Sequence, residues 1–134
     1  MGLILDTGAV IRLAEERRPD VIDLIRAERG RFSYALATLA ELHRGVASST
    51  DEIAHTARGD TLRLALTRGQ LLLPDTGTAS KWGELAAATP RRVVHNDLWI
   101  AATALQHALT LVTFDSDLAA AVRQRNAPVI LFSV

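Results

Sequence analysis

The chain contains no cysteine, so disulfide bonds and thiolate metal sites are excluded and a reducing compartment is the expected setting. Aromatic residues are also scarce, at 4% of the sequence. Because hydrophobic residues still make up 49%, the core must be built mainly from aliphatic side chains and alanine. Charged residues account for 22%, which is close to ordinary globular usage and indicates neither a disordered nor a fibrous protein.

Long hydrophobic runs are absent as well. The longest uncharged segment, residues 98–114, contains Gln106 and His107 and is slightly too short to span a membrane. Near the start of the chain, Asp6 interrupts the sequence before the apolar region of a signal peptide can form. We therefore expect a soluble, cytoplasmic protein without a membrane partner.

Neither sign of charge is in excess. The chain has 15 basic and 15 acidic residues, so its formal net charge is zero. This balance argues against a protein that finds nucleic acid through an overall basic field, and any basic surface must be local. Every basic residue except Lys81 is an arginine, the better bidentate partner for phosphate and carboxylate. The length of 134 residues predicts a single domain, residues 1–134.

A short buried strand is predicted at the start of the chain, and it ends on a carboxylate. The apolar triplet 3–5 is typical of a strand covered on both faces in a parallel sheet. Asp6 follows at the carboxyl edge of that strand, where open α/β sheets bind ligands. Asp6 also precedes Thr7 and Gly8, where it is well placed to cap the next helix. This segment alone supports a ligand site and a helix cap about equally.

The rest of the chain alternates predicted helices and strands. This alternation predicts a parallel sheet wrapped by helices, with right-handed crossovers. Pro19 and Gly30 mark the beginning and the end of one helix, and Gly59 is a weak point in another, which is either one helix or a broken pair. The further strands are expected at 32–36, 70–74, 109–114 and 129–132, and the helices at 9–15, 19–30, from Thr38 to about 47, 51–68, from Thr78 or Ser80 to 88, 98–107 and 118–125.

Acidic residues occur at matching places in this pattern. Asp6 and Asp115 follow strands, whereas Glu41 and Asp97 lie where helices begin. All carboxyl edges of a parallel sheet face one way, so these acids can converge. Their mutual repulsion would be costly without a cation. A hard divalent ion such as Mg²⁺ suits carboxylates, whereas zinc prefers the His or Cys ligands that these positions lack.

Each acid taken alone also has an explanation as a helix cap. Thr38 and Glu41 fit a capping box, and Asp97 with Asn96 stands at a helix start. Asp115 and Asp117 are placed to cap the last helix. Capping explains less well why acids from two strand ends and two helix starts should share one edge of the sheet.

Four segments together resemble the PIN domain, and most of all the VapC-type toxins of bacterial toxin–antitoxin pairs. The resemblance runs essentially from end to end of the chain, and the third segment is the most diagnostic. It implies a three-layer α/β fold with a five-stranded parallel sheet of order 3-2-1-4-5. The segments are 5–10 (LDTGAV), 39–45 (LAELHRG), 96–104 (NDLWIAATA) and 111–117 (LVTFDSD).

The resemblance implies a metal-dependent endoribonuclease and assigns roles to matching residues. Asp6, Glu41 and Asp97 correspond to the acidic triad that holds Mg²⁺ or Mn²⁺. Asp115 matches a fourth acidic position, with Asp117 also in reach, and which of the two leads is left open. Two hydroxyl residues beside the acids, Thr7 and Thr113, match residues that hold water or orient the ligands. One departure from the family pattern is Trp99, which is bulky where a smaller residue is usual.

The resemblance also implies partners. The expected substrate is RNA, commonly transfer or ribosomal RNA, and the expected protein partner is a VapB-type antitoxin that covers the active cleft. A homodimer or a toxin–antitoxin hetero-oligomer is the usual assembly. Candidate contacts to the sugar-phosphate chain are Arg12, Arg44, Arg91 and Arg92, although a solvated or antitoxin-facing surface explains them equally well.

Two rival functions are weighed against this one. A haloacid-type phosphatase needs a second aspartate where Gly8 stands, and a receiver domain needs a late lysine that Lys81 does not supply, so both are weak. The stronger rival is a non-catalytic PIN-like module that binds RNA or acts as a scaffold and keeps the acids as caps.

Overall fold

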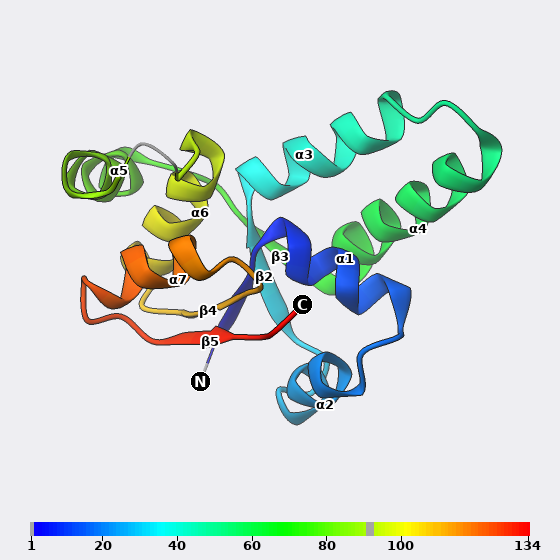
Figure 1. Ribbon diagram of the computed structural model, residues 1–134, viewed down its shortest axis with the longest axis horizontal. Coiled ribbons are helices and arrows are strands. Elements are labelled where there is room, and N and C mark those ends of the chain that lie inside the picture. The colour runs from blue at the N-terminus through cyan, green and yellow to red at the C-terminus, as the bar shows by residue number, and fades with distance from the viewer. Residues whose placement is uncertain (1, 91–92) are drawn as a thin grey trace.

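The computed structural model describes residues 2–90 and 93–134 (Figure 1). In these ranges, five parallel strands form one sheet of order β3-β2-β1-β4-β5, which confirms the predicted topology. The strands are β1 (Leu3–Leu5), β2 (Phe32–Ala35), β3 (Gly69–Leu72), β4 (Thr110–Thr113) and β5 (Val129–Leu131). The helices are α1 (Thr7–Glu15), α2 (Pro19–Ala27), α3 (Leu36–Ala47), α4 (Glu52–Arg68), α5 (Thr76–Ala88), α6 (His95–Gln106) and α7 (Ser116–Arg123).

Helices cover both faces of the sheet and give three layers. Because side chains alternate along a strand, β1 contributes to two separate cores. Leu3 and Leu5 pack with buried residues of α1, α2 and α4, whereas Ile4 packs with residues of α5, α6 and α7. Figure 1 shows these two groups of helices on either side of the strands, with α3 and α4 forming an extended helical hairpin. The core is aliphatic and alanine-rich, as the composition predicted.

Several helices begin earlier than the sequence predicted. Strands β1 and β2 pass into α1 and α3 with almost no connecting loop, so the turn residues become part of the helix. In α5, Asp75 caps the helix by accepting hydrogen bonds from the amides of Gly77 and Thr78, a cap that the sequence prediction missed. The observed first residues are Thr7 rather than Ala9, Leu36 rather than Thr38, Thr76 rather than Thr78 or Ser80, His95 rather than Leu98, and Ser116 rather than Leu118.

These shifts overturn two of the predicted caps. The residues at the cap positions of α3 and α6 are Ala35 and Val94, and neither helix has a capping side chain. The predicted Thr38–Glu41 capping box and the predicted cap at Asp97 are therefore wrong. Because the two helices start early, Glu41 and Asp97 lie inside helices, and their carboxylates are not used to cap them.

Helix α4 is one unbroken helix of 17 residues, so the alternative of a broken pair is wrong. Gly59 lies in its interior with no atom within 4 Å of where a β-carbon would be. Although α4 is the longest helix, none in the described part of the chain is both long enough and apolar enough to cross a membrane.

Gly69 connects α4 directly to β3 and allows close packing there. It pairs with Phe32 of the neighbouring strand β2. A β-carbon at Gly69 would lie 2.7 Å from Cε2 of Phe32 and 2.7 Å from Cε1 of Tyr34, both of which are buried rings. Only a glycine permits this approach of β3 to the core.

We predict opposite stability effects for alanine at the two glycines. Gly69→Ala should lower the free energy of unfolding by about 1–3 kcal/mol, because a methyl group has to displace packed rings. Gly59→Ala should raise it by about 0.5–1 kcal/mol through helix propensity alone. Urea denaturation of both variants measures the difference. Equal stability of Gly69→Ala and the wild type would show that the rings move aside freely.

Candidate functional site

Asp6 ends the central strand and begins the helix that follows it. Its amide donates a hydrogen bond to the carbonyl of Val112 on β4, while its Oδ1 accepts one of 2.8 Å from the amide of Ala9 and caps α1. The side chain is buried, with 5% of the residue exposed. Asp6 therefore caps α1 and at the same time places a carboxylate at the carboxyl edge of the sheet, so the two roles expected for it do not exclude each other.

Strand β4, which lies next to β1, supplies a hydroxyl that contacts both Asp6 and Asp115. Thr113, the last residue of β4, donates a hydrogen bond to Oδ2 of Asp6 and accepts one of 2.9 Å from the amide of Asp115. Asp115 then caps α7 through the amides of Asp117 and Leu118, as predicted. The Thr113 hydroxyl therefore fixes the position of the Asp6 carboxylate relative to the start of α7.

Glu41 approaches the same edge from α3. It is half-buried, and its Oε1 accepts a hydrogen bond of 3.1 Å from the hydroxyl of Thr7, the first residue of α1. Thr7 Oγ1 also lies 3.2 Å from Oγ1 of the buried Thr38. The two predicted hydroxyl residues thus each contact a different acid, Thr113 contacting Asp6 and Thr7 contacting Glu41.

Asp97 lies in the first turn of α6 and is half-buried. No hydrogen bond from the residues that the structure describes reaches its carboxylate. Burial raises the pKa of Asp97 from 3.8 to about 6, and the negative charges of Asp115, Glu41 and Asp6 add to the increase. Burial likewise raises the pKa of Asp6, against the hydrogen bonds from Thr113 and the Ala9 amide and with the charges of Asp115 and Glu41.

These effects show that four predicted acids are gathered at one end of the molecule. We call Asp6, Glu41, Asp97 and Asp115 the acidic edge. The charge of Asp115 acts on both Asp6 and Asp97, and Asp117 lies two residues further on, in the first turn of α7. In residues 2–90 and 93–134, no group of three or more acidic or histidine side chains lies close enough together to hold a metal ion.

Helix N-termini converge on the acidic edge and offset part of its negative charge. Helices α1, α3 and α7 follow directly after β1, β2 and β4, so all three begin at the carboxyl edge of the sheet. The first turn of α6 carries Asp97 to the same place. Unpaired amides and the helix dipole stabilise anions at such ends. Neither α3 nor α6 has a capping side chain, so the first amides of these helices lack the partner that a cap would supply.

The predicted basic contacts have separate surroundings. Arg12, on α1, stacks over the Phe114 ring with its guanidinium 5.4 Å from the ring centre, and Arg44 is exposed in the last turn of α3. Arg91 and Arg92 lie outside the described residues. Sequence reasoning missed Arg17 and Arg58, which line a hollow of about 590 Å³ shared with Thr7 and Glu41. No local pattern marks them, because packing of α4 against α1 and α3 brings them there.

The donor set fits a hard divalent cation. All four side chains of the acidic edge are carboxylates, the ligands that Mg²⁺ prefers. Burial raises the pKa of Asp6 and of Asp97, and the neighbouring negative charges, which a cation would neutralise, add to the increase. Hydrogen bonds from Thr113 to Asp6 and from Thr7 to Glu41 orient two of the four carboxylates.

Comparison with known proteins identifies the family of this chain. The family model of the PIN domain matches residues 3–124, which include the whole acidic edge. The chain belongs to the PIN domain family. It is 34% identical over 120 residues to ribonuclease VapC5 of Mycobacterium tuberculosis, covering 87% of this chain and 85% of that protein. Ribonuclease VapC4 of the same organism is 35% identical over 107 residues, with 74% and 82% coverage.

Solved structures show the same PIN fold. The crystal structure of VapBC-5 from Mycobacterium tuberculosis, a member of the VapBC family of toxin–antitoxin systems, matches with a TM-score of 0.73 and 33% identity over 100% of both chains. VapBC2 from Rickettsia felis, solved bound to a DNA fragment from its promoter, matches with a TM-score of 0.80 over 98% of both chains. Its identity is 20%, so this second likeness concerns the fold alone.

Trp99, the departure from the usual PIN sequence, packs between two helices. Its ring stacks on Trp82 of α5, with ring centres 5.6 Å apart, and His95 meets the Trp82 ring edge-on at 5.7 Å. The bulky residue therefore attaches α6 to α5 two residues beyond Asp97.

We predict that the metal-free protein becomes more stable as the pH falls from 7 to 5. Asp97 has a pKa of about 6 in the folded protein against an ordinary value of 3.8, so between these values the folded state binds the extra proton. This contribution to stability is complete below pH 3.8 and is lost as the pH rises through 6. Asp97→Asn should remove that part of the pH dependence and stabilise the protein at pH 7 by about 1–2 kcal/mol, allowing for partial solvent screening.

Chemical denaturation in chelator at the two pH values measures this effect. Asp23→Asn, an exposed position on α2, is the matched control and should leave the pH dependence unchanged. A marked loss of stability in Asp97→Asn at pH 7 would contradict the repulsion and favour a supporting role for this carboxylate.

Proposed function

We propose that this chain is a metal-dependent endoribonuclease and the toxin of a VapBC-type toxin–antitoxin pair, working as one domain. The observation that carries the proposal is the acidic edge, where four carboxylates come from separate elements and the charges of their neighbours help to raise the pKa values of Asp6 and Asp97. Membership of the PIN domain family and the similarity to proteins named ribonuclease VapC support the same activity.

Asp6, Glu41, Asp97 and Asp115 would hold Mg²⁺, or Mn²⁺ in its place. Asp117, two residues after Asp115, is a further proposed ligand. When bound, such an ion lowers the pKa of a water molecule and shields the charge of the phosphodiester under attack. The chain's own residues prepare the site for this. Thr113 and the Ala9 amide orient the Asp6 carboxylate, and Thr7 orients that of Glu41. We assign Thr7 and Thr113 these positioning roles.

RNA binding at this edge requires donors that outweigh the repulsion between phosphate and carboxylate. The uncapped amides at the starts of α3 and α6 provide such donors. Arg12, Arg44, Arg91 and Arg92 are the proposed contacts to the sugar-phosphate chain, because arginine is suited to phosphate oxygens. Transfer or ribosomal RNA in the cytoplasm is the proposed substrate class.

A VapB-type antitoxin is the proposed protein partner. The matching structure at 33% identity is that of a toxin–antitoxin family member, and it covers the whole of this chain. Helix α4 also leaves apolar side chains in solvent, with Ile53 86% and Leu66 55% exposed. Apolar residues that are exposed to this degree are typical of a surface that a partner covers. The assembly is a homodimer or a toxin–antitoxin hetero-oligomer.

A second candidate is a non-catalytic PIN-like module that binds RNA or acts as a scaffold. The observation in its favour is that Asp6 and Asp115 do cap helices, as a purely structural acid would. The two candidates differ in whether Glu41 and Asp97, which cap nothing, bind a metal.

Cleavage of RNA should depend on Asp97. We expect Asp97→Asn to reduce the rate of endonucleolytic cleavage at least about 100-fold, because the substitution removes a charged ligand while keeping the shape of the side chain. Gel analysis of a structured RNA with Mg²⁺ measures the rate, and Asp23→Asn should cleave like the wild type. Unchanged cleavage by Asp97→Asn would exclude the acidic edge as the catalytic site. Expression without an antitoxin should arrest growth only for chains that cleave.

Metal binding separates the two candidates. We expect Mg²⁺ or Mn²⁺ to raise the melting temperature of the wild type at pH 7, since a ligand that binds only the folded state stabilises it. Asp97→Asn should show a smaller rise, and calorimetric titration should give a weaker affinity. A wild type that binds neither ion would support the non-catalytic module.

A further inference from the structure

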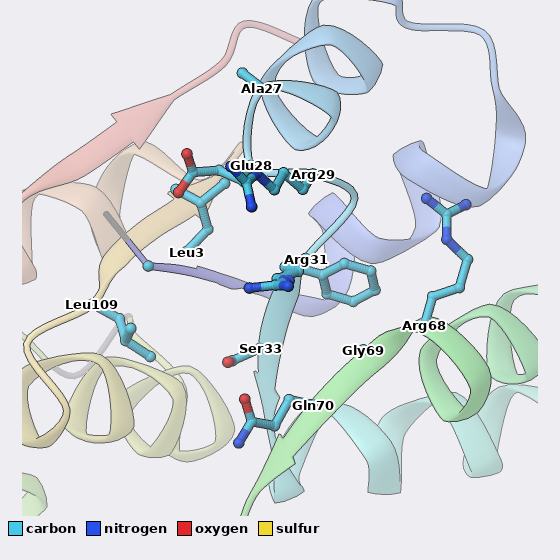
Figure 2. Close-up of a pocket in the computed structure, with 12 residues that line it drawn as sticks. Leu3, Ala27, Glu28, Arg29, Arg31, Ser33, Arg68, Gly69, Gln70 and Leu109 are labelled. Carbon is cyan, nitrogen blue, oxygen red and sulfur yellow. The ribbon is translucent and has the colours of Figure 1, made fainter.

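The opposite edge of the sheet carries a hollow of about 540 Å³ that the proposed function does not use. It lies where β2 and β3 begin, between these strands and the start of β4 (Figure 2). The four residues of β2, at about 3.3 Å each, separate it from the acidic edge by about 13 Å. We call it the amino-edge hollow, and the polar residues that line it are Arg29, Arg31, Ser33, Arg68, Gln70 and Glu28.

Two strands direct uncharged polar side chains into this hollow. Ser33 of β2 and Gln70 of β3 are paired in the sheet, so both point to the same face. Arg31 lies two residues before Ser33 and shares its side, and Figure 2 shows all three extending toward Leu109. Within the described part of the chain, the side chains of Ser33 and Gln70 form no hydrogen bond.

Three arginines gather around the hollow. Arg68, at the end of α4, reaches back so that its Nη2 lies 3.7 Å from where a β-carbon of Gly30 would be, beside the turn that carries Arg29. Among the residues that the structure describes, Arg29, Arg31 and Arg68 form no ion pair. Glu28 is the one acid in the described lining, so the hollow is electropositive.

The backbone of Arg29 adopts a conformation that arginine rarely takes. Its φ is 59°, in the left-handed region, and Gly30 follows with φ 75°. Glycine or asparagine occupies this region at lower cost, so the chain retains an unfavourable residue whose side chain brings a charge to the hollow. Local strain of this kind is concentrated at functional positions.

We infer that the amino-edge hollow binds the phosphodiester backbone of RNA, away from the bond that is cleaved. This inference rests on the proposed function and adds a second contact region to it. The chain has no net charge and presents carboxylates at its reacting edge, so part of its affinity for RNA must come from a separate basic surface. Phosphates would pair with the arginines, and ribose hydroxyls, which an acidic peptide lacks, would pair with the uncharged donors and acceptors of Ser33 and Gln70.

The test compares two double variants with the same change in charge. Arg31→Gln with Arg68→Gln removes two cations from the hollow. Arg26→Gln with Arg63→Gln, two exposed arginines on α2 and α4 that do not line it, is the control. Binding is measured by fluorescence anisotropy in chelator, which keeps the RNA intact, with single-stranded RNA of about 16 and about 4 nucleotides.

The hollow variant should bind the longer RNA about tenfold more weakly than the wild type. For this variant, the slope of log affinity against log salt concentration should be shallower by about 1.4, since each lost phosphate contact reduces the slope by about 0.7. The control should change affinity by less than about twofold. Arg29→Asn, which suits the left-handed backbone, should keep the fold by circular dichroism and also weaken binding of the longer RNA.

Four outcomes would overturn the inference. Equal losses in both double variants would show a general charge effect. Unchanged RNA binding by the hollow variant, together with lost binding of a polyglutamate peptide, would identify a site for an acidic protein segment. A wild type that binds no RNA in chelator and cleaves none with Mg²⁺ would overturn the proposed function as well, whereas a wild type that binds and cleaves RNA beside an equally tight hollow variant overturns this inference alone.

Discussion

Repulsion between carboxylates at the end of the sheet is the constraint on which the rest of this structure depends. Asp6, Glu41, Asp97 and Asp115 come from four different elements, and burial and mutual repulsion raise the pKa values of two of them. Such a group is unfavourable for folding, so the surrounding fold must supply the compensation. The two packed cores on either face of the sheet provide it, since they fix the strands and helices that carry the acids.

The compensation is also local. Asp6 and Asp115 stabilise helices while they contribute to the acidic edge, so part of the cost of placing a charge there is offset by a cap. Glu41 and Asp97 have no such use, and of the two it is Asp97, the least supported by hydrogen bonds, whose pKa is raised to about 6. Capping and ligand binding are therefore not competing explanations of the site. Asp6 and Asp115 cap helices and also belong to the acidic edge, whereas Glu41 and Asp97 belong to the edge without capping a helix.

Charge is divided between the two edges of a neutral molecule. Parallel strands send every carboxyl end, and the N-termini of the helices that follow, to one side. The turns that lead into β2 and β3 gather on the other side, where Arg29, Arg31 and Arg68 surround the amino-edge hollow. Although the formal net charge is zero, carboxylates gather at one edge of the sheet and arginines at the other. No motif in the sequence indicated the position of the arginines.

The sequence by itself determined the fold class and, through the family resemblance, the strand order. Asp6 and Asp115 follow short apolar strands, which are local patterns, whereas the expected convergence of Glu41 and Asp97 rested on predicted helix starts and on the family resemblance. The sequence did not determine helix starts: α3 and α6 begin earlier than the local pattern predicts, and this places Glu41 and Asp97 inside helices rather than at caps. The surroundings of Arg17, Arg58 and Arg68 were decided by tertiary structure alone. Residues that meet only when separate helices pack on a sheet share no spacing in the chain, so no periodicity can indicate their contact.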